Sequence, residues 1–278
     1  MITCGEYLVK QLEAWGVDTV FGIPGVHTVE LYRGLPQTHI RHVTPRHEQG
    51  AGFMADGYAR VTGKPGVCFV ITGPGVTNIL TAMGQAYADS IPMLVISSVN
   101  ERSRLGHGNG YLHELPNQRA MTEGVTAFSH TLLSVDELPA VLGRAFAVFD
   151  SERPRPVHIE LPLDIITASA GHLPVQPRIT VARPSPSQTS IAEAAILLGN
   201  AKSPLLLLGG GCINAQAEVR ALASVLDAPT ALTINAKGLL PPDHPLLIGS
   251  NHSFESVRLM ARDADVVLAI GTELGETD

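Results

Sequence analysis

Glu48 is the residue whose type and surroundings point most directly to chemistry. It lies in the run RHEQGAG at residues 46–52, where an expected strand passes into a helix rich in Gly and Ala. That helix, over residues 53–59, offers the carboxylate almost no polar partner. An acid among apolar neighbours has its neutral form favoured and can share a proton with a ligand. The alternative is that Glu48 only opens the helix, where a negative charge suits the helix dipole.

A glycine-rich turn, TGPGVTN at residues 72–78, stands between an apolar strand and a helix. In an α/β fold with parallel strands, ligands bind at such positions. Asn78 replaces the third glycine of a dinucleotide fingerprint, and no Gly-Lys-Ser/Thr follows as in a phosphate-binding loop. Glycines still let a ligand approach the backbone closely, and a plain strand-to-helix turn is the alternative. A similar turn at residues 209–211 leaves the choice between a nucleotide site and a bare connection open.

The composition narrows the class of protein. With 278 residues, 45% hydrophobic and 16% charged, the chain can bury the cores of one large or two ordinary domains. A net charge of −7 without a basic stripe argues against nucleic-acid binding. Cys4, Cys68 and Cys212 are odd in number and far apart, which fits reduced thiols. The first residues lack a signal peptide and no apolar run reaches the ~18 residues of a membrane span, so a soluble cytoplasmic protein is expected.

The hydrophobic pattern of the first part alternates between helix and strand. Apolar strands are expected at residues 17–21, 40–43, 66–71, 93–97 and 157–161, and helices at 5–15, 28–35, from 48 onward, 76–88 and 135–149. Continuous apolar strands that alternate with helices indicate a parallel sheet covered on both faces. Residues 100–118 show no periodicity and are expected to form either a functional loop or a disordered segment.

A second alternating unit follows a segment rich in Pro and Ser. The fold class is therefore α/β, with a doubly wound domain at residues 1–166, a linker at 167–188 and part of a second Rossmann-like domain at 189–278. In this second domain, helices are expected at 191–198, 218–226 and 254–261, strands at 204–208, 229–234 and 266–270, and a loop at 235–248. The second domain looks incomplete, because a doubly wound sheet normally needs further crossovers.

Five short motifs give the chain a family resemblance. They are FGIPG at residues 21–25, RHEQGA at 46–51, ADGYAR at 55–60, TGPGVTN at 72–78 and ADSIPM at 88–93. Residues 156–164, with Leu161-Pro162, and Gly209-Gly210-Gly211 continue the match. In this order these segments resemble the thiamine-diphosphate-dependent superfamily of acetolactate synthases and 2-oxoacid decarboxylases, and the resemblance spans essentially the whole chain. Within the superfamily, residues 23–31 and 113–118 look most like 5-guanidino-2-oxopentanoate (2-ketoarginine) decarboxylases.

The resemblance implies a cofactor site and a reaction. Glu48 matches the glutamate that hydrogen-bonds N1′ of the cofactor's aminopyrimidine, and the reaction implied is non-oxidative loss of CO2 from a 2-oxoacid such as 5-guanidino-2-oxopentanoate, giving 4-guanidinobutanal. His113 and Glu114 lie in the expected substrate loop, where an acid can pair with a guanidinium and a solvated loop acid is the alternative. The residues that line the pyrimidine pocket by position are Pro24, Gly25, Thr72, Gly73 and Asn78.

Departures from the superfamily's pattern leave other functions open. Residues 112–117 stand where the acetolactate synthases have a Phe-Gln-Glu-Ala-Asp-like stretch. This difference weakens the hypothesis of a carboligase, and the glutamine of that stretch has no match here. The domain that holds the diphosphate and its Mg2+ is absent from this sequence, so the chain is expected to supply one wall of a site built between subunits of a homodimer or homotetramer. An inactive fragment or binding module is a further alternative, and a nucleotide-dependent oxidoreductase is the weakest. The residues predict neither a metal site nor a serine-hydrolase arrangement.

The sequence leaves open whether the protein binds FAD. Some relatives hold a non-catalytic flavin, and the residues at matching positions are Arg153, Gly209, Gly210 and Gly211. Residues 251–254, however, do not reproduce the His-Gly-Thr-like stretch of the flavin binders.

Overall fold

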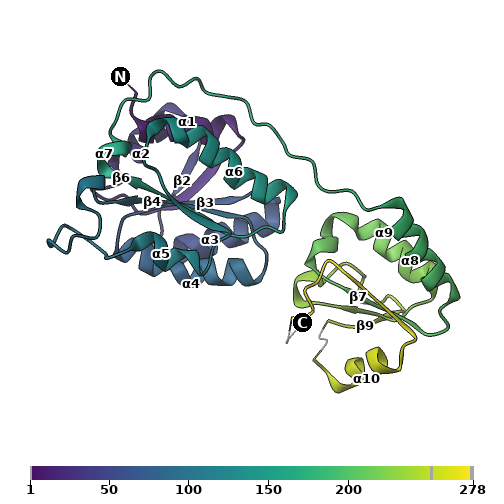
Figure 1. The fold of residues 1–278 in the computed structure, drawn as a ribbon. Helices are drawn as coiled ribbons and strands as arrows, with labels where there is room; N and C mark the ends of the chain where they lie inside the picture. Colours follow the sequence, from purple (N-terminus) through teal and green to yellow (C-terminus); the bar gives the residue numbers. More distant parts are fainter. Residues whose placement is uncertain (1, 251–252, 276–278) are drawn as a thin grey trace. The chain divides into compact units, whose positions relative to one another are not determined.

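The computed structural model describes residues 2–250 and 253–275 and divides the chain into two compact units. Unit 1 comprises residues 1–184 and unit 2 comprises residues 185–278 (Figure 1). Both units are α/β folds with parallel sheets, which confirms the fold class predicted from the sequence.

Unit 1 is a three-layer α/β domain around a six-stranded parallel sheet of order β2-β1-β3-β4-β6-β5. Helices α1, α2 and α6 cover one face and α3 and α4 cover the other (Figure 1). The strands are β1 (Thr19–Gly22), β2 (Arg41–Val43), β3 (Gly66–Val70), β4 (Met93–Val99), β5 (Phe128–Thr131) and β6 (Val157–Pro162). The helices are α1 (Cys4–Ala14), α2 (Val29–Gly34), α3 (Glu48–Thr62), α4 (Pro74–Ala88), α5 (Gln118–Glu123), α6 (Leu138–Ser151) and α7 (Leu163–Ile166), with 3-10 turns at Leu35–Gln37, Arg102–Arg104 and Val135–Glu137.

The strand order of unit 1 reverses twice. The chain passes from β1 outward to β2 and then crosses back to β3 on the other side of β1. Near the opposite edge it passes from β4 to the outer strand β5 and returns to β6 beside β4. In open parallel sheets, ligands bind beyond the carboxyl ends of the strands at such reversals. Unit 1 therefore has two candidate binding positions, one at β1 and β3 and one at β4 and β6.

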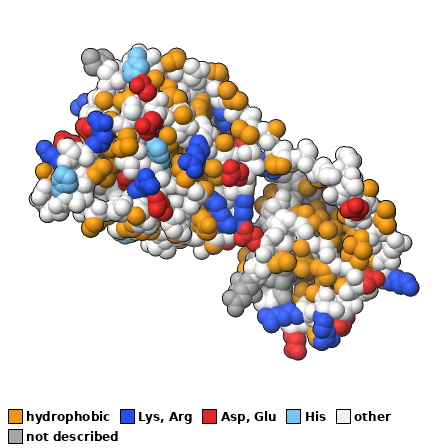
Figure 2. All heavy atoms as spheres, viewed as in Figure 1, with side chains coloured by type: hydrophobic (Ala, Val, Ile, Leu, Met, Phe, Trp, Pro, Cys, Tyr) orange, Lys and Arg blue, Asp and Glu red, His pale blue; other side chains and the backbone are white. Residues whose placement is uncertain are grey.

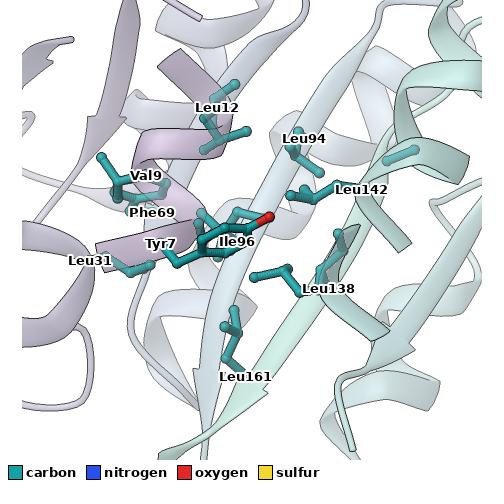
Figure 3. Close-up of a cluster of buried hydrophobic side chains, with 14 of the residues drawn as sticks. Tyr7, Val9, Leu12, Leu31, Phe69, Leu94, Ile96, Leu138, Leu142 and Leu161 are labelled. Atoms are coloured by element: carbon teal, nitrogen blue, oxygen red, sulfur yellow. The ribbon is translucent and has the colours of Figure 1, made fainter. Parts of the chain in front are cut away.

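The larger core of unit 1 lies between α1, α6 and the sheet. Tyr7 is fully buried there among the side chains of α1, β3, β4 and α6 (Figure 3). Its hydroxyl donates to Gln11 Oε1 and to the Pro174 carbonyl, at 3.0 Å each, so the polar end of the ring is satisfied. A capping box between Thr3 and Glu6 begins α1, because each residue's side chain accepts the other's backbone N–H.

Residues 167–184, predicted as part of the linker, belong to unit 1 in the structure. Their backbone is held by side chains of α1. Gln11 Nε2 and Trp15 Nε1 donate to the Gln176 carbonyl at 2.7 and 2.9 Å, and Gln176 N donates back to Gln11 Oε1 at 3.0 Å. The sequence gives no local sign of these bonds, because the partners lie 161–165 residues apart.

Unit 2 is a smaller sheet of order β10-β7-β8-β9 with parallel neighbours. Successive leucines of β7 point to opposite faces: Leu206 and Leu208 pack in the core under α9, and Leu205 and Leu207 pack with Val257 of α10. Helix α8 buries none of its residues. The elements are α8 (Gln188–Asn200), β7 (Pro204–Leu208), α9 (Gln216–Leu226), β8 (Thr230–Leu232), β9 (Leu247–Gly249), α10 (Glu255–Asp263) and β10 (Val266–Ile270), with 3-10 turns at Gly210–Ala215 and Ile234–Ala236.

The short elements that were not predicted from the sequence include α5, β5, α7 and β9. Helix α5 begins at Gln118, which the sequence placed at the end of the irregular loop, and Asn117 caps it by accepting from Ala120 N at 2.9 Å. Strand β5 has four residues, none fully buried, and β9 has three, so neither carries a usable hydrophobic pattern. Pairing with a neighbouring strand, β6 for β5 and β8 for β9, positions them.

The surface of the chain mixes both charge signs. On the face drawn in Figure 2, Lys and Arg side chains lie among Asp and Glu side chains, and hydrophobic side chains gather on the visible face of unit 2. Described ion pairs that link the two signs include Arg60 with Asp56 and Lys64 with Asp18. No helix among the described residues is both long and apolar enough to cross a membrane.

Substitutions in α3 test how closely it packs against α4. Gly52→Ala places a Cβ 3.0 Å from Ile79 Cγ1 and closer still to Ala82, so overpacking is expected to lower the free energy of unfolding of unit 1 by about 1–3 kcal/mol. The control Gly57→Ala, with no heavy atom within 4 Å of the new Cβ, should raise it by about 0.5–1 kcal/mol because Ala favours the helix. Urea unfolding followed by the fluorescence of Trp15, the chain's one tryptophan, measures both. Equal stabilities of the two variants would contradict the close packing.

Candidate functional site

The first reversal of the sheet gathers the turns that the sequence singled out. Pro24 and Gly25 follow the carboxyl end of β1, and Thr72 and Gly73 follow β3 and lead into α4. Gly25 is held in a tight turn, since its N–H donates to Thr28 Oγ1 at 3.1 Å and its carbonyl accepts from the same hydroxyl at 3.0 Å. The two turns are adjacent because β1 and β3 are neighbours in the sheet. This edge is therefore the ligand position that the topology favours.

Glu48 and Asn78 meet between two helices. Glu48 is the first residue of α3 and is half-buried, and Asn78 lies in the second turn of α4. Asn78 Nδ2 donates to Glu48 Oε2 at 2.8 Å, so the partner that the helix of Glu48 itself does not offer comes from α4. Among the described residues, no hydrogen bond involves Glu48 Oε1. One carboxylate oxygen is thus fixed by the protein, and the other can receive an N–H from a ligand.

Two histidines flank the Gly73 turn. Gly73 has φ 65°, and a Cβ there would lie 2.8 Å from His113 Cβ, so the loop packs directly on the turn. The ring of His113 meets that of His27 edge to face with centroids 6.4 Å apart. Burial, and secondarily the nearby His113, lowers the pKa of His27 and favours its neutral imidazole. The structure brings the predicted His113 to the turn and adds His27, which the sequence reading missed although it lies two residues after Gly25.

Glu114 is occupied by the backbone of its own loop. Its carboxylate accepts from the N–H groups of Gly108, Gly110 and Tyr111 at 2.6, 2.9 and 3.1 Å. Although desolvation acts to raise it, these backbone bonds hold the pKa of Glu114 below its usual range. The side chain therefore organises the loop.

Gln118 is the buried residue that ties this turn to the sheet. Its Oε1 accepts from Thr72 Oγ1 and from Gly73 N, at 2.8 Å each. Its Nε2 donates to Ser97 Oγ at 3.1 Å and to Glu160 Oε2 at 3.0 Å. From the sequence, Gln118 was placed only at the end of an irregular loop, and the glutamine of the acetolactate synthases was expected to have no counterpart in this chain. In the structure a glutamine amide does support the Gly73 turn.

The same network continues to a buried histidine. His158 is fully buried, with Nε2 2.8 Å from Ser97 Oγ and Nδ1 2.7 Å from Ser129 Oγ and 2.9 Å from Thr122 Oγ1. Burial lowers the pKa of His158 to about 3, so the ring is neutral at physiological pH. A signal for these residues was present, because His158 and Glu160 alternate with apolar residues in β6 and so share one face.

The residues considered for a flavin have local roles. Arg153 Nε donates to Ser90 Oγ at 2.7 Å in unit 1. In unit 2, Gly211 N donates to the Gly271 carbonyl at 3.0 Å, and a Cβ at Gly209 or Gly211 would collide with the backbone at Gly271. A Cβ at Gly210 would lie 3.1 Å from that of Asn235. Close chain packing thus accounts for Gly209 and Gly211, and residues 251–252 of the stretch that argued against flavin lie outside the described residues.

A metal position does not emerge from the described part of the chain. Within residues 2–250 and 253–275, no group of three or more His, Cys, Asp or Glu side chains is arranged to hold an ion. The three cysteines are free and buried. At the first reversal the described residues offer a carboxylate with one oxygen bonded by the protein, glycine turns and the His27 imidazole, whose pKa is lowered by burial. These groups fit a nitrogen heterocycle.

Comparison with known proteins identifies the class. Residues 2–121 match the thiamine pyrophosphate enzyme N-terminal TPP-binding domain, and residues 191–278 match the central domain of the same enzymes. Together the two matches cover most of the chain, and the chain belongs to the thiamine pyrophosphate enzymes, as the motifs predicted. The cofactor of this class, thiamine diphosphate, contains nitrogen heterocycles, and the Glu48 oxygen without a described partner could bond a ring nitrogen.

Three curated relatives show which kinds of enzyme the chain is similar to. The chain is 56% identical over 280 residues to a probable 2-ketoarginine decarboxylase of Pseudomonas aeruginosa, covering 100% of this chain and 50% of the relative. It is 39% identical over 279 residues to the acetolactate synthase isozyme 1 large subunit of Escherichia coli, covering 99% of this chain and 49% of the relative. It is 32% identical over 286 residues to the chloroplastic acetolactate synthase of Arabidopsis thaliana, covering 98% of this chain and 41% of the relative. The chain spans about half the length, or slightly less, of these curated relatives.

The buried His158 predicts an acid sensitivity of unit 1. Its pKa is lower in the folded chain than in the unfolded one, so below about pH 6.5 the unfolded state binds the extra proton and stability falls by up to about 1.4 kcal/mol per pH unit. His158→Gln should flatten the dependence of the unfolding free energy on pH between 7 and 5, measured by urea unfolding. The exposed loop variant His107→Gln should keep the wild-type slope. An unchanged slope in His158→Gln would show that this ring does not titrate as described.

Proposed function

We propose that this chain provides the pyrimidine-binding part of an enzyme that decarboxylates a 2-oxoacid non-oxidatively. The substrate proposed is 5-guanidino-2-oxopentanoate, which yields 4-guanidinobutanal and CO2. The observation that carries the proposal is the Glu48 carboxylate, with one oxygen held by Asn78 at 2.8 Å and the other without a protein partner among the described residues. The 56% identity to a probable 2-ketoarginine decarboxylase supports the choice of substrate.

The chain's own residues have separable tasks in this proposal. When bound, thiamine diphosphate supplies the electron sink that loss of CO2 from a 2-oxoacid requires. Glu48 holds and shares a proton at the aminopyrimidine ring nitrogen, and Asn78 fixes the carboxylate's orientation. Gly25 and Gly73 let the chain pack closely at the two turns, because a Cβ would meet Ile71 at Gly25 and His113 at Gly73. Gln118 fixes Thr72 and Gly73, so that the pocket wall does not have to reorganise.

Two alternatives are distinguished by their products. An acetolactate-synthase-like carboligase, supported by 39% identity to the large subunit from Escherichia coli, would join two 2-oxoacid-derived units and release an acetohydroxy acid. The proposed decarboxylase releases one aldehyde from one 2-oxoacid. An inactive binding module would release neither, and product analysis of the whole protein separates the three.

We further propose that Mg2+ binds with the cofactor's diphosphate and is held outside the residues described here. A second subunit of a homodimer or homotetramer completes the active site. The enzyme acts in the cytoplasm, which the three free cysteines support. Flavin is left out of the proposal, because Arg153 and the 209–211 turn have the local partners described above.

Glu48→Gln in the whole protein tests the proposed role of the carboxylate. Exchange of the C2 proton of bound thiamine diphosphate, followed by NMR in deuterated buffer, is expected to slow by about 10²–10⁴-fold, because an amide cannot share the required proton. The matched variant Glu193→Gln, at an exposed position on α8, should exchange at the wild-type rate. Exchange in Glu48→Gln at close to the wild-type rate would remove Glu48 from the mechanism.

A further inference from the structure

A cavity lies at the second reversal of the sheet, beyond the carboxyl ends of β4 and β6. Its volume is about 480 Å³. Glu160 of β6 and Thr131 of β5 line it on the side of the sheet, the loop of residues 105–117 contributes Leu105, Gly106 and the segment 115–117, and α5 contributes Gln118. Glu114 holds this loop in shape through its backbone bonds. The cavity is therefore formed by ordered elements at a position where α/β folds bind ligands.

Glu160 is a buried acid that has no cationic partner among the described residues. Glu160 is only 3% exposed. Its Oε1 accepts a hydrogen bond from Thr131 Oγ1 at 2.6 Å, and its Oε2 accepts one from Gln118 Nε2 at 3.0 Å. Among the described residues no ion pair includes Glu160. The basic groups that face it are Arg119 and His130, but Arg119 pairs with Glu123 at 2.9 Å and His130 pairs with Glu137 at 3.2 Å. A buried carboxylate is costly unless a cation compensates it.

We propose that the Glu160 cavity binds the guanidinium end of the substrate. Each oxygen of the carboxylate has accepted one hydrogen bond and keeps capacity for another, which suits the two parallel N–H groups of a guanidinium. The identification of this ligand as the substrate rests on the proposed decarboxylase function. From the sequence, the acid was expected in the loop, at Glu114, which is held by its own loop in the structure. Two acids line the cavity, Glu160 and Glu123, and of these Glu123 is paired with Arg119, which also lines the cavity, whereas Glu160 has no ion pair among the described residues.

Gln118 connects this cavity to the proposed reaction site. One end of its amide accepts from Thr72 and Gly73, and the other end donates to Glu160. The two positions are therefore separated by a single buried side chain. A substrate can place its keto group by the Gly73 turn and its cation by Glu160 only if they are neighbours in this way.

Glu160→Gln in the whole protein tests the inference by substrate selectivity. The amide keeps the size of the side chain and can bond both Thr131 and Gln118, but it has no charge. We expect kcat/KM for 5-guanidino-2-oxopentanoate to fall, through KM, by at least tenfold more than kcat/KM for the uncharged 2-oxohexanoate falls. An equal loss for both substrates, or no loss for either, would overturn the proposal. Glu160→Asp, which keeps the charge but withdraws it by one methylene, should give an intermediate KM.

Binding of a probe separates this inference from the decarboxylase proposal. Calorimetric titration with butylguanidinium should show binding to the wild type and to the control Glu152→Gln, an exposed position in the same unit. Affinity should fall at least tenfold in Glu160→Gln. Binding that is unaffected by Glu160→Gln would overturn the cation site. If the protein decarboxylates no 2-oxoacid but still binds butylguanidinium through Glu160, the proposed function fails and the cation site stands.

Discussion

The close packing of α3 against α4 is the constraint on which the proposed chemistry depends. Gly52 faces Ala82 and Ile79, and a Cβ at that position would not fit. Only side chains this small let the two helices approach so closely that Asn78 on one reaches Glu48 on the other at 2.8 Å. A wider separation would leave the carboxylate without the partner that fixes its orientation. The glycines and alanines of this region thus serve the site as much as the fold.

A buried polar network joins this site to the second reversal of the sheet. Gln118 bonds the Gly73 turn at one end and Glu160 at the other, and Ser97 extends the network to His158. Satisfied buried networks are rigid, because a broken bond leaves an unpaired polar group in an apolar interior. The Gly73 turn and the proposed cation cavity are therefore set by one arrangement of side chains rather than by two independent ones.

Much of this could be predicted from the sequence, and the remainder has identifiable causes. Apolar strands between helices gave the parallel α/β class, which the structure confirms, and the motifs gave the family. The short elements α5, β5 and β9 could not be found, because each has too few residues for a hydrophobic period. The role of Gln118 was equally hidden, since its partners lie up to 46 residues away and only the sheet brings them together. The pocket residues, Glu48 included, remain predictions that the geometry supports.

A crystal structure of the whole protein with thiamine diphosphate bound tests the central claim most directly. The quantity to measure is the distance from Glu48 Oε1 to N1′ of the aminopyrimidine. Our account predicts a hydrogen bond of about 2.6–3.2 Å there, with Asn78 still donating to Oε2. A carboxylate that turns to solvent, or a pyrimidine that is bound by a different side chain, would contradict it.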